Sequence, residues 1–257
     1  MITKLLSVAF NKLELVNYDV LYLYSDLREL GKLRDSRSSK AEFLDQIIDL
    51  LIKSSGTLIV PTFSYTTDGI FYPKSTPTYL GALNSRIVKR IDFVRSDHPL
   101  FSHAGTGSYA SLLDDIDKSA FGKESVYGRL HNLNHLRAAF LYIGRPVAAG
   151  NTMPHYIEQN NSVPYRFEKT FPTKVLKENM SYETGYSAFV RKQNNPFNDY
   201  AFSFALASEH LYKAGAIKEV FLKEKFTNIS IIELQNFVQI LNLGLANNPN
   251  FFLKHPM

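Results

Sequence analysis

Apolar and polar positions near the start of the chain follow the pattern of two strands with a helix between them. Residues 18–24 are aromatic and aliphatic enough for a buried strand. Residues 41–52 carry apolar side chains at helical spacing, and Ser38 or Ser39 can cap this helix. Residues 56–61 form a second apolar run that a proline closes. This order of elements is typical of a parallel α/β sheet.

The rest of the chain continues to alternate between strand-like and helix-like segments. Residues 62–79 form a long, turn-rich loop. Loops of this length more often have a function than serve only as connections. Residues 247–257 show no clear element. The pattern predicts strands or extended segments at 101–106, 138–143, 165–175, 186–192 and 217–222, and helices at 81–91, 126–133, 197–214 and 229–243.

Composition sets limits on the class of protein. The chain has 257 residues, 45% of them hydrophobic, which suits one large domain or two small ones. It has no cysteine, so disulfides, thiolate catalysis and cysteine zinc sites are excluded, and a cytoplasmic enzyme is the plain interpretation. No apolar run approaches membrane-spanning length. Residues 1–10 weakly resemble a signal peptide, but no cleavage site follows, so we expect neither secretion nor a membrane partner.

The net charge of +5, with a pI of about 9.1, favours anionic partners. Nucleic acid, a phosphorylated cofactor and a nucleotide-linked substrate all fit this charge. The basic residues are scattered rather than clustered, which favours a phosphorylated small molecule and argues against nucleic acid. A mildly basic solvated surface would have the same composition.

A histidine and a carboxylate follow the apolar run at 138–143. Residues 150–158 read Gly-Asn-Thr-Met-Pro-His-Tyr-Ile-Glu, so His155 and Glu158 share one face if this segment is helical. An imidazole beside a carboxylate can take a proton from a nucleophile at neutral pH. Alone, the histidine would more often be a structural residue than a catalytic base, and the pair could be a hydrolase base or a buried structural contact. The histidines other than His98 and His155 lack metal-binding spacing and are interpreted as structural or surface residues, so we predict no metal.

Six short strings occur in a fixed order between residues 24 and 158. They are Tyr-Ser-Asp-Leu-Arg-Glu-Leu-Gly at 24–31, Gly-Thr-Leu-Ile-Val-Pro-Thr-Phe-Ser-Tyr at 56–65, Thr-Pro-Thr-Tyr-Leu-Gly-Ala-Leu at 76–83, Arg-Ser-Asp-His-Pro-Leu-Phe-Ser at 95–102, Phe-Gly-Lys-Glu-Ser at 121–125, and the 150–158 segment. Together they resemble the aminoglycoside 3-N-acetyltransferase family, over residues 15–170. The resemblance implies a single acyltransferase domain over residues 1–257. This domain is expected to be an α/β/α sandwich with a mixed, largely parallel sheet, and residues 171–257 complete the sheet and the helical layers.

The resemblance also implies direct transfer of an acyl group from coenzyme A to an amine, with no covalent enzyme intermediate. His155 is the expected base, and Glu158 either orients it or binds the substrate ammonium. Asp26 departs from the family, which more often has serine there. A carboxylate repels phosphate, so we expect Asp26 to cap the backbone instead. The cofactor loop implied by the family match is Ser25, Asp26, Leu27 and Gly31.

Further residues follow from the same strings. Arg34, Arg37 and Lys40 could offset phosphate charge or form a solvated basic loop. His98 could contact a substrate or shape the turn at Pro99. We expect Thr62, Phe63 and Ser64 along the pantetheine arm, Ser102 as a donor near the thioester, and Tyr65, His98, Glu158 and Asn160 at the acceptor.

The choice of acceptor depends on the loops that flank these strings. Residues 66–77 contain one acid, Asp68, and residues 158–161 contain only Glu158. Tyrosines and asparagines dominate there, and they suit a base or sugar. We therefore expect a nucleotide-linked amino sugar that receives an acetyl or hydroxyacyl group. The alternatives are an antibiotic-modifying aminoglycoside acetyltransferase and a non-catalytic binding module of the same fold. The sequence leaves a homo-oligomer possible.

Overall fold

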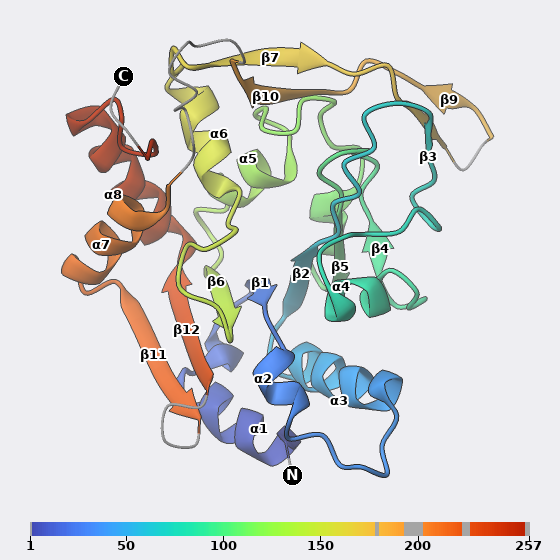
Figure 1. Ribbon diagram of the computed structural model, residues 1–257, viewed down its shortest axis with the longest axis vertical. Coiled ribbons are helices and arrows are strands. Elements are labelled where there is room, and N and C mark those ends of the chain that lie inside the picture. Colours follow the sequence, from blue (N-terminus) through green and yellow to red (C-terminus); the bar gives the residue numbers. More distant parts are fainter. Residues whose placement is uncertain (1, 178–179, 193–202, 223–226, 255–257) are drawn as a thin grey trace.

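Three parallel strands form the centre of a seven-stranded sheet in the computed structural model, which describes residues 2–177, 180–192, 203–222 and 227–254 (Figure 1). Strand β1 (Val20–Ser25) lies between β2 (Thr57–Pro61) and β6 (Ala138–Ile143) and pairs with both in parallel. Their carboxyl ends therefore open at one edge of the sheet, where α/β proteins place ligand sites.

Antiparallel strands extend the sheet on both sides. On one side β12 (Thr227–Glu233) pairs with β6 and with β11 (Ile217–Leu222). On the other, β5 (His103–Gly107) joins β2 to the two-residue β4 (Val94–Arg95). The predicted mixed sheet is confirmed. Parallel pairing is confined to the three central strands, so the sheet is less parallel than the sequence pattern indicated.

Helices cover both faces of this sheet, which confirms the predicted α/β/α sandwich (Figure 1). Alternate residues of β1 enter opposite cores: Tyr22 and Tyr24 face one, Leu21 and Leu23 the other. The leucine side packs against α1 (Ile2–Lys12), α3 (Lys40–Lys53) and α4 (Ala82–Ile87). The tyrosine side packs against α5 (Val126–His131), α6 (Met153–Asn160), α7 (Ala205–Lys213) and α8 (Leu234–Asn247).

Two small sheets stand apart from the central one. The first is an antiparallel pair of β7 (Arg166–Thr170) and β10 (Ser187–Arg191), here called the β7–β10 ribbon, which crosses over α6 and α5 in Figure 1. Ser187 ties it to the body, since its N–H donates to the Lys118 carbonyl and its carbonyl accepts from the Ala120 N–H. The second joins β3 (Ile70–Phe71), β8 (Lys174–Leu176) and β9 (Tyr182–Glu183).

Several local predictions need correction. The helix expected at 229–243 begins only at Leu234, because the preceding β-branched isoleucines belong to β12 and pair with β6. Of the helix expected at 197–214, residues 197–202 lie outside the described ranges, and the described helix is α7. Residues 2–12 form α1, and its apolar face is buried in the core. Within the described ranges, no helix has the length and apolarity needed to cross a membrane.

Candidate active site

Asn151 fixes the start of α6 against the ends of two central strands. The side chain is fully buried. Its Oδ1 accepts hydrogen bonds from the Tyr24 hydroxyl (3.0 Å) and the Met153 N–H (2.8 Å), and its Nδ2 donates to the Tyr142 hydroxyl (2.8 Å). Tyr24 lies in β1 and Tyr142 in β6, so one amide joins both strands to the first turn of the helix. Pro154, in that turn, has the backbone angle that a helix start favours.

His155 and Glu158 lie together on this helix, as their spacing predicted. The His155 Nδ1 is 2.7 Å from the Glu158 Oε2. The Glu158 side chain is fully buried, whereas the His155 side chain is 19% exposed. A carboxylate can only accept from the ring, so Nδ1 carries the hydrogen and Nε2 carries the lone pair. The histidine therefore presents its basic nitrogen on the side away from Glu158.

Arg166 is the third member of this group, and sequence analysis missed it. Its Nε lies 2.8 Å from the Glu158 Oε2, and its side chain is 6% exposed. Its Nη1 donates to the Phe189 carbonyl in β10 at 3.1 Å. Arg166 thus neutralises the buried carboxylate and joins the β7–β10 ribbon to α6. In the sequence Arg166 directly follows Pro164-Tyr165, eight residues after Glu158, and this spacing gives no signal of the contact.

Burial and charge set the protonation states of this triad. Burial lowers the pKa of His155, as does the charge of Arg166, and the hydrogen bond to Glu158 only partly offsets them. Burial by itself raises the pKa of Glu158, but His155 and Arg166 outweigh it and leave this pKa below its usual value. At neutral pH the site therefore holds a neutral imidazole beside an ionised carboxylate.

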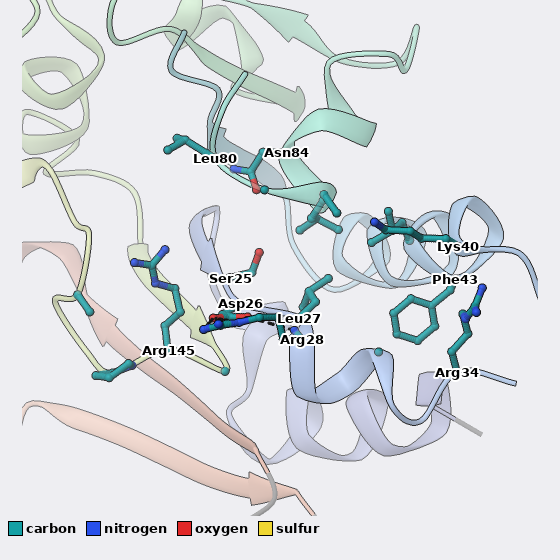
Figure 2. Close-up of a pocket in the computed structure, with 18 residues that line it drawn as sticks. Ser25, Asp26, Leu27, Arg28, Arg34, Lys40, Phe43, Leu80, Asn84 and Arg145 are labelled. Carbon is teal, nitrogen blue, oxygen red and sulfur yellow. Dashed lines mark hydrogen bonds and ion pairs between the residues drawn. The ribbon is translucent and has the colours of Figure 1, made fainter. Parts of the chain in front are cut away.

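A cavity of about 810 Å³ opens beside the end of β1, and Figure 2 shows its lining. All four residues predicted for the cofactor loop, which are Ser25, Asp26, Leu27 and Gly31, line it. The loop after β6 contributes Gly144, Arg145, Pro146 and Ala149. That loop continues through Asn151 into α6, so the same short segment reaches from the cavity to His155.

Asp26 caps the backbone, as its unusual identity predicted. Its Oδ1 accepts from the Arg28 N–H at 3.1 Å, and both its oxygens accept from the Arg28 guanidinium at 2.6–3.0 Å. The hydrogen bonds from Arg28 lower the pKa of Asp26. Beside Asp26, Gly144 in the loop after β6 adopts φ +66°, and a Cβ there would lie 2.3 Å from the Asp26 carbonyl oxygen. Only glycine permits this close approach of the two loops.

Three cations remain to balance an anion in this cavity. Arg34, Lys40 and Arg145 line it, and no ion pair joins any of them to a carboxylate within the described ranges. Figure 2 shows Arg145 on the opposite side of the cavity from Arg34 and Lys40. Arg37, by contrast, pairs with Asp35 and does not line the cavity. Arg145 was not anticipated from the sequence.

Thr62 and Ser102 lie in a buried hydrogen-bond network instead of in this cavity. Both side chains are fully buried. The Ser102 hydroxyl donates to the Thr62 carbonyl at 2.8 Å and accepts from the Arg95 Nε at 3.1 Å. The Arg95 guanidinium also donates to the carbonyls of Pro73 and Thr76 in the long loop. The network holds residues 62–79 onto the sheet.

The other predicted residues are distributed around the same region. Phe63 and Ser64 are buried, and the Ser64 hydroxyl donates to the Pro99 carbonyl. Tyr65 is 47% exposed and adopts φ +49°. The rings of Tyr65, Phe101, Phe121 and His155 contact one another in that order. Their successive centroids lie 5.8, 5.0 and 5.6 Å apart. Asn160 is exposed at the end of α6.

His98 and His103 are buried histidines with different surroundings. The His98 Nε2 donates to the Ser187 carbonyl at 3.1 Å, its Nδ1 accepts from the Leu100 and Phe101 N–H groups, and burial lowers its pKa to about 4. His103 lies among the rings of Tyr22, Phe63 and Tyr127 at 5.1–5.6 Å. Neither of its ring nitrogens has a hydrogen-bond partner in the described part of the chain. Burial, then the nearby His98, lowers its pKa to about 3.

Among the residues that the structure describes, no group of three or more histidine, aspartate or glutamate side chains is placed to hold a metal ion.

Comparison with known proteins identifies the family. The family model for aminoglycoside 3-N-acetyltransferase matches residues 23–242. No curated protein sequence matches the chain. Solved structures with the same fold include aminoglycoside acetyltransferase AAC(3)-IVa as apoenzyme, with TM-score 0.73 and 21% identity over 99% of this chain and 92% of that one.

Two further solved structures were determined with ligands. AAC-IIIb, a binary complex with CoASH, has TM-score 0.75 and 14% identity, over 98% of this chain and 97% of that one. AAC-VIa bound to sisomicin has TM-score 0.73 and 19% identity, over 95% of this chain and 97% of that one. At these identities the likeness establishes a shared fold. The family match, which spans most of the chain, confirms the prediction of an N-acyltransferase that uses an acyl-coenzyme A. The chain belongs to the aminoglycoside 3-N-acetyltransferase family.

Proposed function

We propose that this protein transfers an acetyl group from acetyl-coenzyme A to an amine of an aminoglycoside, with His155 as the general base. The observation that carries the proposal is the buried Glu158 at 2.7 Å from the His155 Nδ1, which leaves Nε2 as the basic nitrogen. The lowered pKa of His155 keeps that nitrogen unprotonated at neutral pH. It can then accept a proton from the substrate ammonium, which must become a neutral amine before it can attack.

The position of Glu158 supports one of its two predicted roles over the other. A carboxylate whose side chain has no exposed surface, and which already contacts His155 and Arg166, is badly placed to receive a substrate ammonium. We therefore assign Glu158 to holding the histidine in one tautomer and stabilising it once it is protonated.

The cavity lined by Arg34, Lys40 and Arg145 fits the phosphates of coenzyme A. Arg34, Lys40 and Arg145 have no carboxylate partner among the described residues, and Arg28 neutralises Asp26. Positive charge is therefore in excess where a diphosphate and a ribose phosphate would lie. Bound acetyl-coenzyme A supplies the activated acyl group as a thioester. The loop from Gly144 to Asn151 connects this cavity to the base, and AAC-IIIb, which shares the fold, has been solved with CoASH.

The nucleotide-linked amino sugar expected from the sequence is not supported as acceptor. The family match and a same-fold relative solved with sisomicin favour an aminoglycoside. The expectation depended on the shortage of acids in residues 66–77 and 158–161, and those loops are only part of the surroundings of His155. Glu168 of β7 and Asp117 both accept hydrogen bonds from Ser119, whose hydroxyl accepts in turn from Gln159 of α6, the helix that carries His155.

A coenzyme A release assay tests the proposal. The panel contains aminoglycosides such as sisomicin and, in parallel, nucleotide-linked amino sugars. We expect turnover of the aminoglycosides and a kcat lower by about 10²–10⁴-fold in His155→Gln. His135→Gln, which changes an exposed histidine, is the matched control and should behave as wild type. Turnover of nucleotide-linked sugars alone would contradict the acceptor, and a near-normal rate in His155→Gln would contradict the base.

A further inference from the structure

His98 is a buried histidine that the proposed reaction does not use. Its side chain is 1% exposed. The His98 Nδ1 accepts from the N–H groups of Leu100 and Phe101 at 3.3 and 3.2 Å. Nε2 therefore carries the hydrogen, which it donates to the Ser187 carbonyl at 3.1 Å. One ring thus caps the turn after Pro99 and also binds the first residue of β10.

Ser187 is the point at which the β7–β10 ribbon is attached to the body of the protein. Besides the bond from His98, its carbonyl accepts from the Ala120 N–H at 2.9 Å, and its N–H donates to the Lys118 carbonyl at 2.8 Å. The ring of Tyr186, the preceding residue, packs edge-on against the His98 ring with 5.6 Å between centroids. His98 therefore contacts the ribbon through a hydrogen bond and through a ring.

The other end of the ribbon brings two arginines to the base. Arg166 and Arg191 are direct cross-strand partners, so their side chains extend from the same face of the ribbon. Arg166 contacts Glu158, and the charges of both arginines lower the pKa of His155. Glu158, on α6, acts on this pKa in the opposite direction. The position of the ribbon therefore sets the balance of charge around the base.

A two-stranded ribbon does not hold this arrangement by itself. Isolated hairpins are marginally stable in water, and like charges directly opposite each other on two strands repel. The ribbon therefore depends on contacts with the rest of the protein, and His98 supplies one that is shielded from water. Ser187 and Arg191 are four residues apart on one paired strand, which is about 13 Å.

We infer that His98 is a positioning residue, which docks the β7–β10 ribbon so that Arg166 and Arg191 stay in place beside His155 and Glu158. The inference rests on the proposed role of His155 as general base. The sequence left two other roles open for His98, a substrate contact and a turn. Because both of its ring nitrogens are already bonded within the protein, the substrate contact is disfavoured.

Two substitutions separate docking of the ribbon from shaping of the turn. His98→Asn keeps an acceptor near the Nδ1 position and loses the donor to Ser187, whereas His98→Gln keeps a donor near the Nε2 position and loses the acceptor. An NMR titration of the His155 ring, assigned with His155→Gln, measures the result. The pKa of His155 should rise by about 0.5–1 unit in His98→Asn, and His98→Gln should recover most of this shift. Amide hydrogen exchange in β7 and β10 should be about five- to tenfold faster in His98→Asn.

The control is His135→Gln, which changes an exposed histidine and should leave the pKa of His155 unaltered. A shift in His98→Gln as large as that in His98→Asn would assign His98 to the turn and overturn the inference. Arg191→Met tests the same link at an exposed position of the ribbon and should also raise the pKa of His155. An unchanged value there would overturn the inference even if neither His98 variant folds.

The titration and the exchange measurement use the protein without substrate. Absence of aminoglycoside turnover by the wild-type protein would therefore contradict the proposed function and leave the test of His98 intact.

Discussion

Replacement of His103 by leucine should make the protein less sensitive to acid. The His103 ring is buried among three aromatic rings and has a pKa of about 3, well below the ordinary value of 6.5. The folded state therefore holds this imidazole neutral under conditions in which the unfolded chain would protonate it. Leucine has a similar volume and does not titrate.

The sign and size of the effect follow from the two pKa values. A group whose pKa is lowered by folding stabilises the protein fully above its unfolded pKa and loses that contribution as pH falls toward its folded pKa. A pH of 4.5 is two units below 6.5, the ordinary pKa of the imidazole in the unfolded chain, and still above the pKa of about 3 that His103 has in the folded protein. Each unit corresponds to about 1.36 kcal/mol, so protonation of His103 in the unfolded chain destabilises the wild type by about 2.7 kcal/mol. At pH 7.5 this effect is close to zero.

Urea denaturation at several pH values between 4.5 and 7.5 measures this difference. The free energy of unfolding should fall over that range by about 2.7 kcal/mol less in His103→Leu than in wild type. The comparison uses the change with pH, so a constant packing cost of the leucine cancels. His135→Gln removes an exposed histidine and provides the control. Identical pH dependence in His103→Leu and wild type would refute the reasoning, because the buried imidazole would then contribute nothing.

Three further outcomes follow from the site. Arg166→Met should lower the free energy of unfolding by about 3 kcal/mol in chemical denaturation, because the buried Glu158 carboxylate loses its cationic partner. In a pH–rate profile the same variant should show the acid limb of kcat/KM at higher pH, because Arg166 lowers the pKa of His155. Arg145→Gln should raise the KM for acetyl-coenzyme A about tenfold at unchanged kcat, by steady-state kinetics. Gly144→Ala should cost more than about 2 kcal/mol by thermal unfolding, since its Cβ would meet a carbonyl oxygen at 2.3 Å.

Local pattern was enough to predict the centre of the fold. The apolar run at 138–143 coincides with β6, and the helix expected at 41–52 is α3, capped by Ser39 in a capping box with Glu42. Both depend on periodicity and on short-range hydrogen bonds, which a sequence displays directly. At 229–233 the same reasoning failed, because those isoleucines pair with β6, a strand almost ninety residues earlier. A period-based argument has no access to such a partner.

The candidate site was predicted in part for the same reason. The His155–Glu158 and Asp26–Arg28 contacts join residues at most three positions apart, so they are within reach of local sequence reasoning. Arg166 comes to Glu158 only because a ribbon folds back over α6. Ser102 and Thr62 look like available hydroxyls in the sequence, but Arg95 brings them into a network that includes a loop about twenty residues upstream. Long-range packing decides which polar groups are available.

The amide of Asn151 has a consequence for the rotation of α6. Each residue of an α-helix turns by about 100°, so a helix that started one residue earlier or later would carry His155 about a quarter of a turn around the axis. Asn151 excludes that slip, because its Oδ1 is bonded to the N–H of Met153 while its other bonds reach β1 and β6. The strands of the sheet therefore determine, through the Asn151 side chain, the angle at which the imidazole of His155 points.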